Sequence, residues 1–431
     1  MINCRIKVAR LQGSKVTRLQ GCIVATLLLS FLFFQPSFVQ AEVGYAMRGD
    51  AQPFNNWDGA FNSSASDSDG DNGFIFNSDS FSLRPHLSVS GGYDDNVYLA
   101  PANQIDDTYY TISPGIMLVY GSENDDYISL NYVYEVTKYS TEDSLDYDSH
   151  LFSLGLHLAP GKLRIHLSDQ FENSTDVDPE TSQHTARLQN IENLNISRFI
   201  SRKTSLLASQ AYIINDYEDD GFLDYDEFWL GGSVHHQTFP KVSTFVGGRY
   251  GIINMKDSNV IGDSDYVEAD VGIQGRLTAK STLHTQLGWQ NRRFKDDIED
   301  INEWTGVIGL SSRFSSRTYW GVDASRGLTP SSQRGGYTRL PASITPTIRH
   351  ILWRDHIALS LSGSYEIADY YGPQGKEDRS DKYWYITGIL DWSPVSAFNV
   401  GIGYTYSKQE SNFDEFEYEQ NLIFLRGMGN Y

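Results

Sequence analysis

Cysteine is nearly absent from this sequence. Only two occur in 431 residues, Cys4 and Cys22, and both lie at the N-terminal end. Disulfide frameworks and thiolate metal sites need several cysteines, so the rest of the chain is expected to have neither. Basic residues are also scarce: 34 Lys and Arg stand against 55 Asp and Glu, a formal net charge of −21. This balance excludes a protein that binds nucleic acid through a basic surface.

Long apolar runs are missing as well. Past residue 41, no stretch approaches the roughly 20 apolar residues that a transmembrane helix requires, which excludes a helical membrane protein. The mean hydropathy of −0.40 is what a soluble protein would give. A membrane β-barrel is still compatible with this value, because only half of each strand is apolar.

The first 41 residues have the features of a secretory signal peptide. Five basic residues precede an apolar run from Ile23 to Phe34, and the small residue Ala41 ends the cleavage site. An uncleaved anchor is the alternative, although the run is short for one. Cleavage would leave no cysteine and a charge of −26, because 29 basic residues would face 55 acidic ones. Such an exported chain, rich in Tyr and Gly, fits a Gram-negative envelope.

Residues 42–80 form a flexible segment by composition, since they are rich in Asn, Asp, Ser and Gly and show no period. Within them, Asp67, Asp69 and Asp71 alternate as at the start of a calcium loop, where several oxygens bind the ion. Asn72 stands where such a loop has glycine, and no Glu closes it. A polar linker is therefore the alternative to a calcium site, and a calorimetric calcium titration distinguishes the two.

From Phe81 onward, apolar and polar residues alternate in segments of about ten to fifteen residues. In one of them, Val267 and Val271 alternate with Glu268 and Asp270. A period of two with one apolar face is the signature of a β-strand, and no segment shows a convincing helical period. The chain is therefore predicted to be all-β.

Short and long connectors alternate between these segments, which predicts about 18 strands. The count falls to about 16 if residues 186–198 and 337–350, which alternate poorly, are not strands; Pro341 and Pro346 weaken the second further. Acidic residues crowd the long connectors, one of them at 372–381, and basic residues gather near the short ones. We therefore predict a transmembrane antiparallel up-and-down β-barrel with short periplasmic turns and longer acidic extracellular loops.

Closure into a barrel is favoured over a soluble sandwich, because so many strands would otherwise leave open edges that aggregate. The polar face of the strands would then line a lumen wide enough for water unless something plugs it. The candidates for this lining are Arg249, Glu268, Asp270, Gln274, Arg276, His284, Gln286, Arg292 and Glu366. The alternative is that these residues pair with one another as structural ladders.

A family resemblance starts in the segment Leu87–Tyr98, which contains the run Gly-Tyr-Asp-Asp-Asn at 92–96. It resembles the opening strand of the beta-barrel porin type 2 family, and the hairpins that follow extend the resemblance over about residues 81–431. The resemblance implies a bacterial outer-membrane barrel, and some members are associated with exopolysaccharide production and secretion.

The C-terminal strand departs from the usual outer-membrane pattern, which is a final aromatic residue with apolar residues at alternate positions before it. Tyr431 is aromatic but follows two glycines on its face, whereas Tyr418, Leu422 and Phe424 form a better alternating set seven residues earlier. The usual pattern is therefore matched better at Phe424 than at Tyr431.

These observations predict three parts: a signal peptide (1–41), a flexible segment (42–80) and an outer-membrane β-barrel (81–431). The barrel would give passage to polar solutes by diffusion, with saccharide transport or exopolysaccharide export as the more specific hypothesis. The alternative is a non-conducting structural or binding barrel whose acidic loops bind divalent ions, matrix polysaccharide or partner proteins. No cofactor or enzymatic activity is expected, since no Ser, His and Asp set stands in motif form.

The expected partners follow from this placement in the outer membrane, after cleavage near Ala41. They are outer-membrane lipid and lipopolysaccharide, the barrel assembly machinery, and polysaccharide or the proteins that secrete it. Nucleic acid is not expected among them.

Overall fold

The computed structural model describes residues 76–78, 80–121, 126–175, 177–178, 180, 183–219, 222–256, 262–295, 299–332, 338–353, 356–372, 375–395 and 397–430. The predicted signal peptide, the calcium candidates Asp67, Asp69 and Asp71, and Tyr431 lie outside these residues. Within them, no helix is both long enough and apolar enough to cross a membrane.

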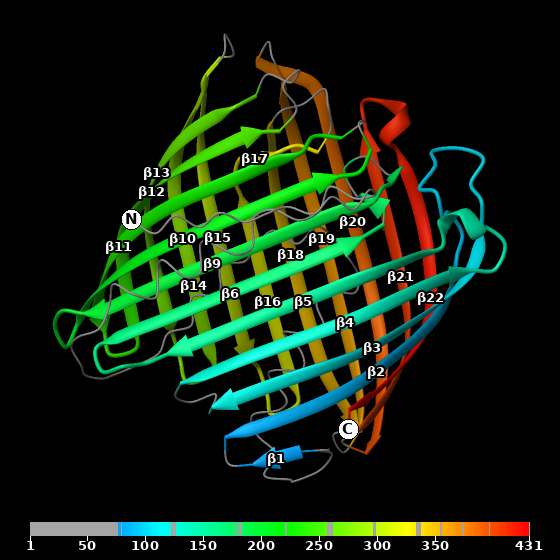
Figure 1. Ribbon diagram of the computed structural model, residues 1–431, viewed down its shortest axis with the longest axis horizontal. Coiled ribbons are helices and arrows are strands. Elements are labelled where there is room, and N and C mark those ends of the chain that lie inside the picture. Colours follow the sequence, from blue (N-terminus) through cyan, green and yellow to red (C-terminus); the bar gives the residue numbers. More distant parts are fainter. Residues whose placement is uncertain are drawn as a thin grey trace, which may run out of the picture.

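Eighteen long antiparallel strands form a closed barrel (Figure 1). They are β2 (Phe81–Asp94), β3 (Asp107–Gly121), β4 (Tyr127–Tyr139), β5 (Tyr147–Leu158), β6 (Leu163–Ser174), β9 (Arg187–Phe199), β10 (Thr204–Tyr217), β11 (Tyr225–Phe239), β12 (Val242–Met255), β13 (Ser264–Arg276), β14 (Ser281–Phe294), β15 (Ile301–Arg313), β16 (Thr318–Arg326), β18 (Thr338–Trp353), β19 (Ile357–Gly372), β20 (Gly375–Val395), β21 (Phe398–Ser411) and β22 (Tyr418–Asn430). The predicted fold class and the higher strand count are confirmed.

The remaining elements are short. β1 (Phe76–Ser78) pairs with β2, and β17 (Thr329–Pro330) pairs with β18. The strands β7 (Val177–Asp178) and β8 (Gln183–His184) form a hairpin of their own inside the connector between β6 and β9. Two 3-10 turns, η1 (Asp143–Leu145) and η2 (Asp414–Phe416), lie in long connectors.

The barrel closes through β2 and β22, which pair from His86↔Asn430 to Asp94↔Leu422. Both segments that alternate poorly in the sequence are strands, β9 and β18. The pairing of β18 with β19 is interrupted between Ile344↔Tyr365 and Thr347↔Ser362, with the same register on both sides, because Pro346 has no N–H to donate to the ladder. β18 keeps its place through continuous pairing with β16.

The long connector predicted at 372–381 is wrong. β19 runs to Gly372 and β20 begins at Gly375, and the two strands stay paired up to Gly372↔Gly375. A hairpin that extends beyond a bilayer needs no apolar face, so its polar sequence looks like a loop. This extension carries Arg379 and Asp381, which are both buried.

The two faces of each strand differ in burial as a barrel in lipid requires. On β13 and β14, Val267, Val271 and Trp289 are at least half exposed. Their chain neighbours Glu268 and Gln290 are only 3% and 1% exposed. The apolar residues therefore face outward and the polar residues face the interior.

The alternating set of the last strand faces the barrel interior. Tyr418, Leu422 and Phe424 are buried inside the barrel, and Ile423 and Leu425 are exposed on its outside. Both faces of β22 carry apolar residues here, so alternation alone does not say which face points outward.

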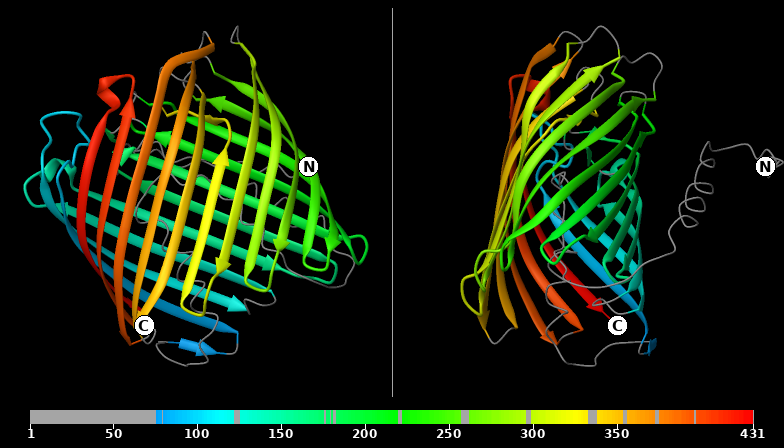
Figure 2. Two further views of the ribbon diagram at one scale, coloured as in Figure 1. Left: turned by 180° about the vertical axis from the view of Figure 1, so that it is seen from behind. Right: turned by 90° about the vertical axis from the view of Figure 1, so that its left-hand side faces the viewer.

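The barrel is flattened, as the side view in Figure 2 shows, and the strands of its two walls cross at a steep angle. Its interior is packed unevenly. Ala211, Trp229, Ile253 and Tyr266 form one buried apolar cluster on β10–β13, and a second cluster combines Ile301 and Leu340 with Leu328 of the β16–β18 connector. These two clusters pack part of the β10–β18 side of the interior.

Candidate functional site

A cavity of about 620 Å³ occupies the other side of the barrel interior. Its wall is formed by consecutive strands around the barrel seam, from β20, β21 and β22 through β2–β6 to β9. Hydroxyl side chains predominate there, including Ser88, Ser90, Ser113, Ser149 and Ser407. These small residues alternate with apolar residues such as Val89 and Ile112, which are exposed on the outside of the barrel, and their short side chains leave space in the interior.

Cross-strand hydrogen bonds between hydroxyls hold this wall in place. The Oγ1 atoms of Thr111 and Thr137 are 3.0 Å apart, and Ser149 donates to Ser174 at 2.9 Å. Such pairs satisfy groups that would otherwise be unpaired, and they leave neighbouring hydroxyls to meet water or a solute.

Tyrosines form the larger surfaces of the cavity. Six of them line it: Tyr109, Tyr139, Tyr147, Tyr383, Tyr385 and Tyr418. The rings of Tyr383 and Tyr418 lie 6.4 Å apart, those of Tyr383 and Tyr385 lie 6.1 Å apart, and those of Tyr109 and Tyr139 lie 5.9 Å apart. Each ring offers an apolar face and a polar hydroxyl edge, a combination suited to amphipathic ligands.

The charged groups of the cavity wall are mostly acidic. Asp94, Glu135 and Glu172 line it together with a single arginine, Arg426. Arg426 donates to Asp391 at 2.8 Å, and Asp94 accepts from Gln420 at 2.7 Å. The balance of the wall is therefore negative.

Eight of the nine predicted lumen residues lie on β12–β14, on the other side of the interior, and Glu366 lies on β19, opposite Tyr383 of β20 in the ladder. Arg249 donates twice to Glu268, at 2.7 and 3.1 Å, and its guanidinium lies 5.4 Å from the ring of Trp229. Arg292, 1% exposed, donates to Thr338 at 3.0 Å and to the Leu328 carbonyl at 3.3 Å. These contacts form a packed network.

The other six predicted lumen residues have different surroundings. Gln274 lies 3.4 Å from His235, the ring of His284 stacks 6.1 Å from that of Phe245, and Glu366 pairs with Arg339. Asp270 and Gln286 are half-buried, and Arg276 is exposed beside the short β13–β14 connector. None of the nine borders the 620 Å³ cavity, so their role as the wall of a solute path stays a prediction.

The cavity tyrosines were not among the predicted lumen residues. A signal for them is present in the sequence, because Tyr383 and Tyr385 share a strand face with Thr387 and Asp391 rather than with the outward Ile386 and Leu390. The aromatic rings resemble an interfacial girdle when they are considered singly, and only their position around one cavity distinguishes them.

Comparison with known proteins gives one family. The family model described as "Putative beta-barrel porin 2" matches residues 78–427. No curated protein matches the chain.

Solved structures match this fold at low sequence identity. Pseudomonas aeruginosa OccK2 (OpdF) is 11% identical over 81% of this chain and 98% of that chain, with a TM-score of 0.45. The outer membrane protein opdK of the same organism is 11% identical over 81% and 99%, with a TM-score of 0.44. Acinetobacter baumannii OccAB4 is 10% identical over 81% and 98%, with a TM-score of 0.43.

Proposed function

Because this chain belongs to the family described as "Putative beta-barrel porin 2" and is an outer-membrane β-barrel, we propose that it gives passage to polar solutes of the saccharide class. The observation that carries the proposal is the cavity lined by six tyrosines and many hydroxyls. Its volume of about 620 Å³ lies within the range of about 300–1,000 Å³ that is usual for small-molecule sites.

The chemistry of a sugar matches both components of this wall. The C–H face of a pyranose ring is apolar and can lie on a tyrosine ring, while its hydroxyl rim exchanges hydrogen bonds with Ser, Thr and Tyr hydroxyls. Weak contacts of this kind along a wet wall let a solute bind and leave again, which passage requires. Export of exopolysaccharide is the narrower form of this proposal, and neighbouring genes for glycosyltransferases would support it.

The purified protein in planar lipid bilayers is expected to give discrete conductance steps that neutral oligosaccharides reduce. Replacing Tyr385, which lines the cavity, with serine should weaken this block about tenfold, the loss of about 1.4 kcal/mol of ring contact. Tyr250→Ser is the matched control, because Tyr250 is exposed on the outside of the barrel. Heat-modifiable gel mobility verifies that both variants fold. If oligosaccharides block both variants equally, Tyr385 is not part of the binding surface.

A non-conducting barrel is the second candidate function. It is favoured by the two buried apolar clusters on the β10–β18 side, which pack part of the interior. The absence of conductance in correctly folded protein would favour this candidate over passage, and the acidic connectors would then be tested for binding of divalent ions and matrix polysaccharide.

A further inference from the structure

The connector between β6 and β9 contacts the opposite wall of the barrel. Its partner is the β16–β18 connector, and around the closed sheet these two connectors are separated by six strands one way and eight the other. Contacts between positions so far apart on the ring are made only across the barrel, not along its wall. Ser331 and Ser332, which receive the connector, are 0% and 5% exposed.

Two carboxylates of the connector make these contacts. Ser331 donates its hydroxyl to Glu180, and Ser332 donates to Glu180 through both its backbone N–H and its hydroxyl, each at 3.1 Å. The second carboxylate, Asp178, is 5% exposed and accepts from the Tyr217 hydroxyl of β10 at 2.9 Å. A buried carboxylate is costly unless several donors surround it, and here the donors come from opposite sides of the barrel.

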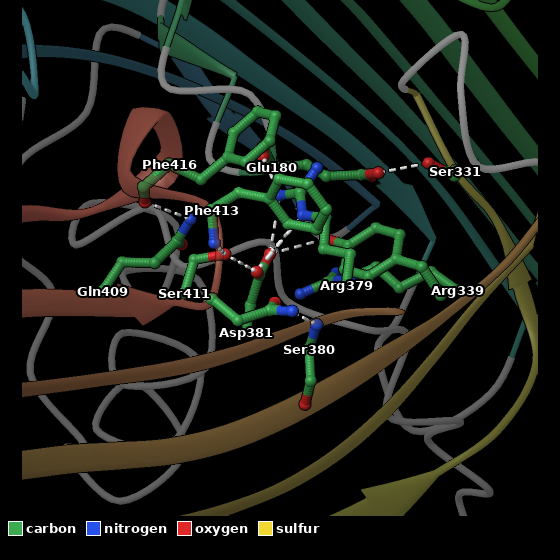
Figure 3. A network of polar contacts seen from close by, with 12 residues as sticks. Glu180, Ser331, Arg339, Arg379, Ser380, Asp381, Gln409, Ser411, Phe413 and Phe416 are labelled. Atoms are coloured by element: carbon green, nitrogen blue, oxygen red, sulfur yellow. Dashed lines mark hydrogen bonds and ion pairs between the residues drawn. The ribbon is translucent and has the colours of Figure 1, made fainter. Parts of the chain in front are cut away.

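The β19–β20 extension supplies a third anchor. Arg379 donates from Nη2 to the backbone carbonyl of Glu180 at 2.9 Å while the same guanidinium pairs with Asp381 (Figure 3). The connector is thus fixed to β10, to the β16–β18 connector and to β20 at the same time.

The connector also meets the cavity. Nε2 of His184, in β8, lies 3.4 Å from the carbonyl of Val97, and Val97 belongs to the cavity wall. The connector strands therefore adjoin the cavity at the end of the long connectors, and their position bears on how wide the cavity is there.

We propose that Glu180 is a size-determining residue of the solute path: through Ser331 and Ser332 it holds the β6–β9 connector across the barrel, so that solutes pass only on the tyrosine-lined side. The carboxylate acts through the connector that it positions. This inference rests on the proposed function, since it assumes that solutes pass at all.

The test compares single-channel conductance and the size limit for neutral oligosaccharides, measured by liposome swelling, in the full-length protein and its variants. Glu180→Ala is expected to raise conductance about twofold and to admit larger oligosaccharides, because the connector loses its carboxylate contacts with Ser331 and Ser332. Two contacts stay in this variant: Arg379 still donates to the backbone carbonyl of residue 180, and Asp178 still accepts from the Ser332 hydroxyl at 3.3 Å. Glu180→Gln, which keeps one acceptor oxygen, should give an intermediate value. The pair Ser331→Ala and Ser332→Ala attacks the same contact from the other side and should reproduce the effect.

Glu299→Ala is the matched control, because Glu299 is an exposed acid in another long connector. Unchanged conductance and size limit in Glu180→Ala, with a conducting parent protein, would overturn the inference and leave the proposed function intact. A parent and variants that all fold but do not conduct would overturn both. Conductance that appears only in the Glu180 and serine variants would support Glu180 as the determinant while favouring the closed barrel as the native state.

Discussion

Replacing Arg379 with methionine is expected to lower the free energy of unfolding by about 3 to 5 kcal/mol. Arg379 and Asp381 are 3% and 4% exposed, and their Nη2 and Oδ2 atoms are 2.6 Å apart. Without the guanidinium, the Asp381 carboxylate would stay buried with only hydroxyl donors, from Tyr370 at 3.0 Å and Ser411 at 2.7 Å. The cost of a buried charge without its counter-charge accounts for the size of the effect.

The environment of Arg379 also makes lysine a poor substitute. The guanidinium carbon lies 3.5 Å from the ring centre of Phe416 and 4.2 Å from that of Tyr370. A planar cation stacks between such rings and still hydrogen-bonds at its edge, whereas an ammonium group does not. Arg379→Lys should therefore recover only part of the stability.

Urea titration of the protein in lipid vesicles, followed by tryptophan fluorescence, measures this loss. Lys382→Met is the matched control, since Lys382 is exposed on the same strand. Adding Asp381→Asn to Arg379→Met should restore part of the stability, because it removes the unpaired charge. A loss no larger than that of Lys382→Met would show that the buried pair contributes little.

Replacing Arg249 with methionine is expected to cost about 3 kcal/mol without changing conductance or oligosaccharide block. The Glu268 side chain is 2% exposed and would keep the Thr305 hydroxyl as a donor, at 3.0 Å. Arg249 also covers the rings of Trp229 and Tyr266, at 5.4 and 5.6 Å, so packing is lost together with the charge. Because this network lies away from the cavity, the effect should be on stability alone.

The comparison for Arg249 is Arg293→Met, which removes an exposed arginine on the outward face of β14. The double variant Arg249→Met with Glu268→Gln should be more stable than Arg249→Met alone, as a double-mutant cycle would show. A changed ion selectivity in Arg249→Met would contradict the structural role and place Arg249 on the solute path, as strand alternation predicts.

The period-two alternation and the spacing of the connectors determined the all-β class, the closed barrel and the strand number. These properties are local, because a strand in lipid must present one apolar face whatever its neighbours are. Alternation does not predict the paired strand ends at 372–375, because a strand outside the bilayer need not present an apolar face. The last strand carries apolar residues on both faces, Ile423 and Leu425 on one and Leu422 and Phe424 on the other, and only pairing with β2 and β21 decides which face points outward.

Only the tertiary structure determines where the candidate site lies inside the barrel. Alternation identifies which residues point inward, and it does so equally for Arg249 and for Tyr383. It does not say that one side of the interior is packed by Trp229, Tyr266 and their neighbours while the other stays open. That division depends on the flattening of the barrel and on connectors such as the one carrying Glu180, whose contacts join residues about 150 positions apart in the chain. Contacts at this distance leave no period in a sequence, so only the folded barrel reveals where a solute can pass.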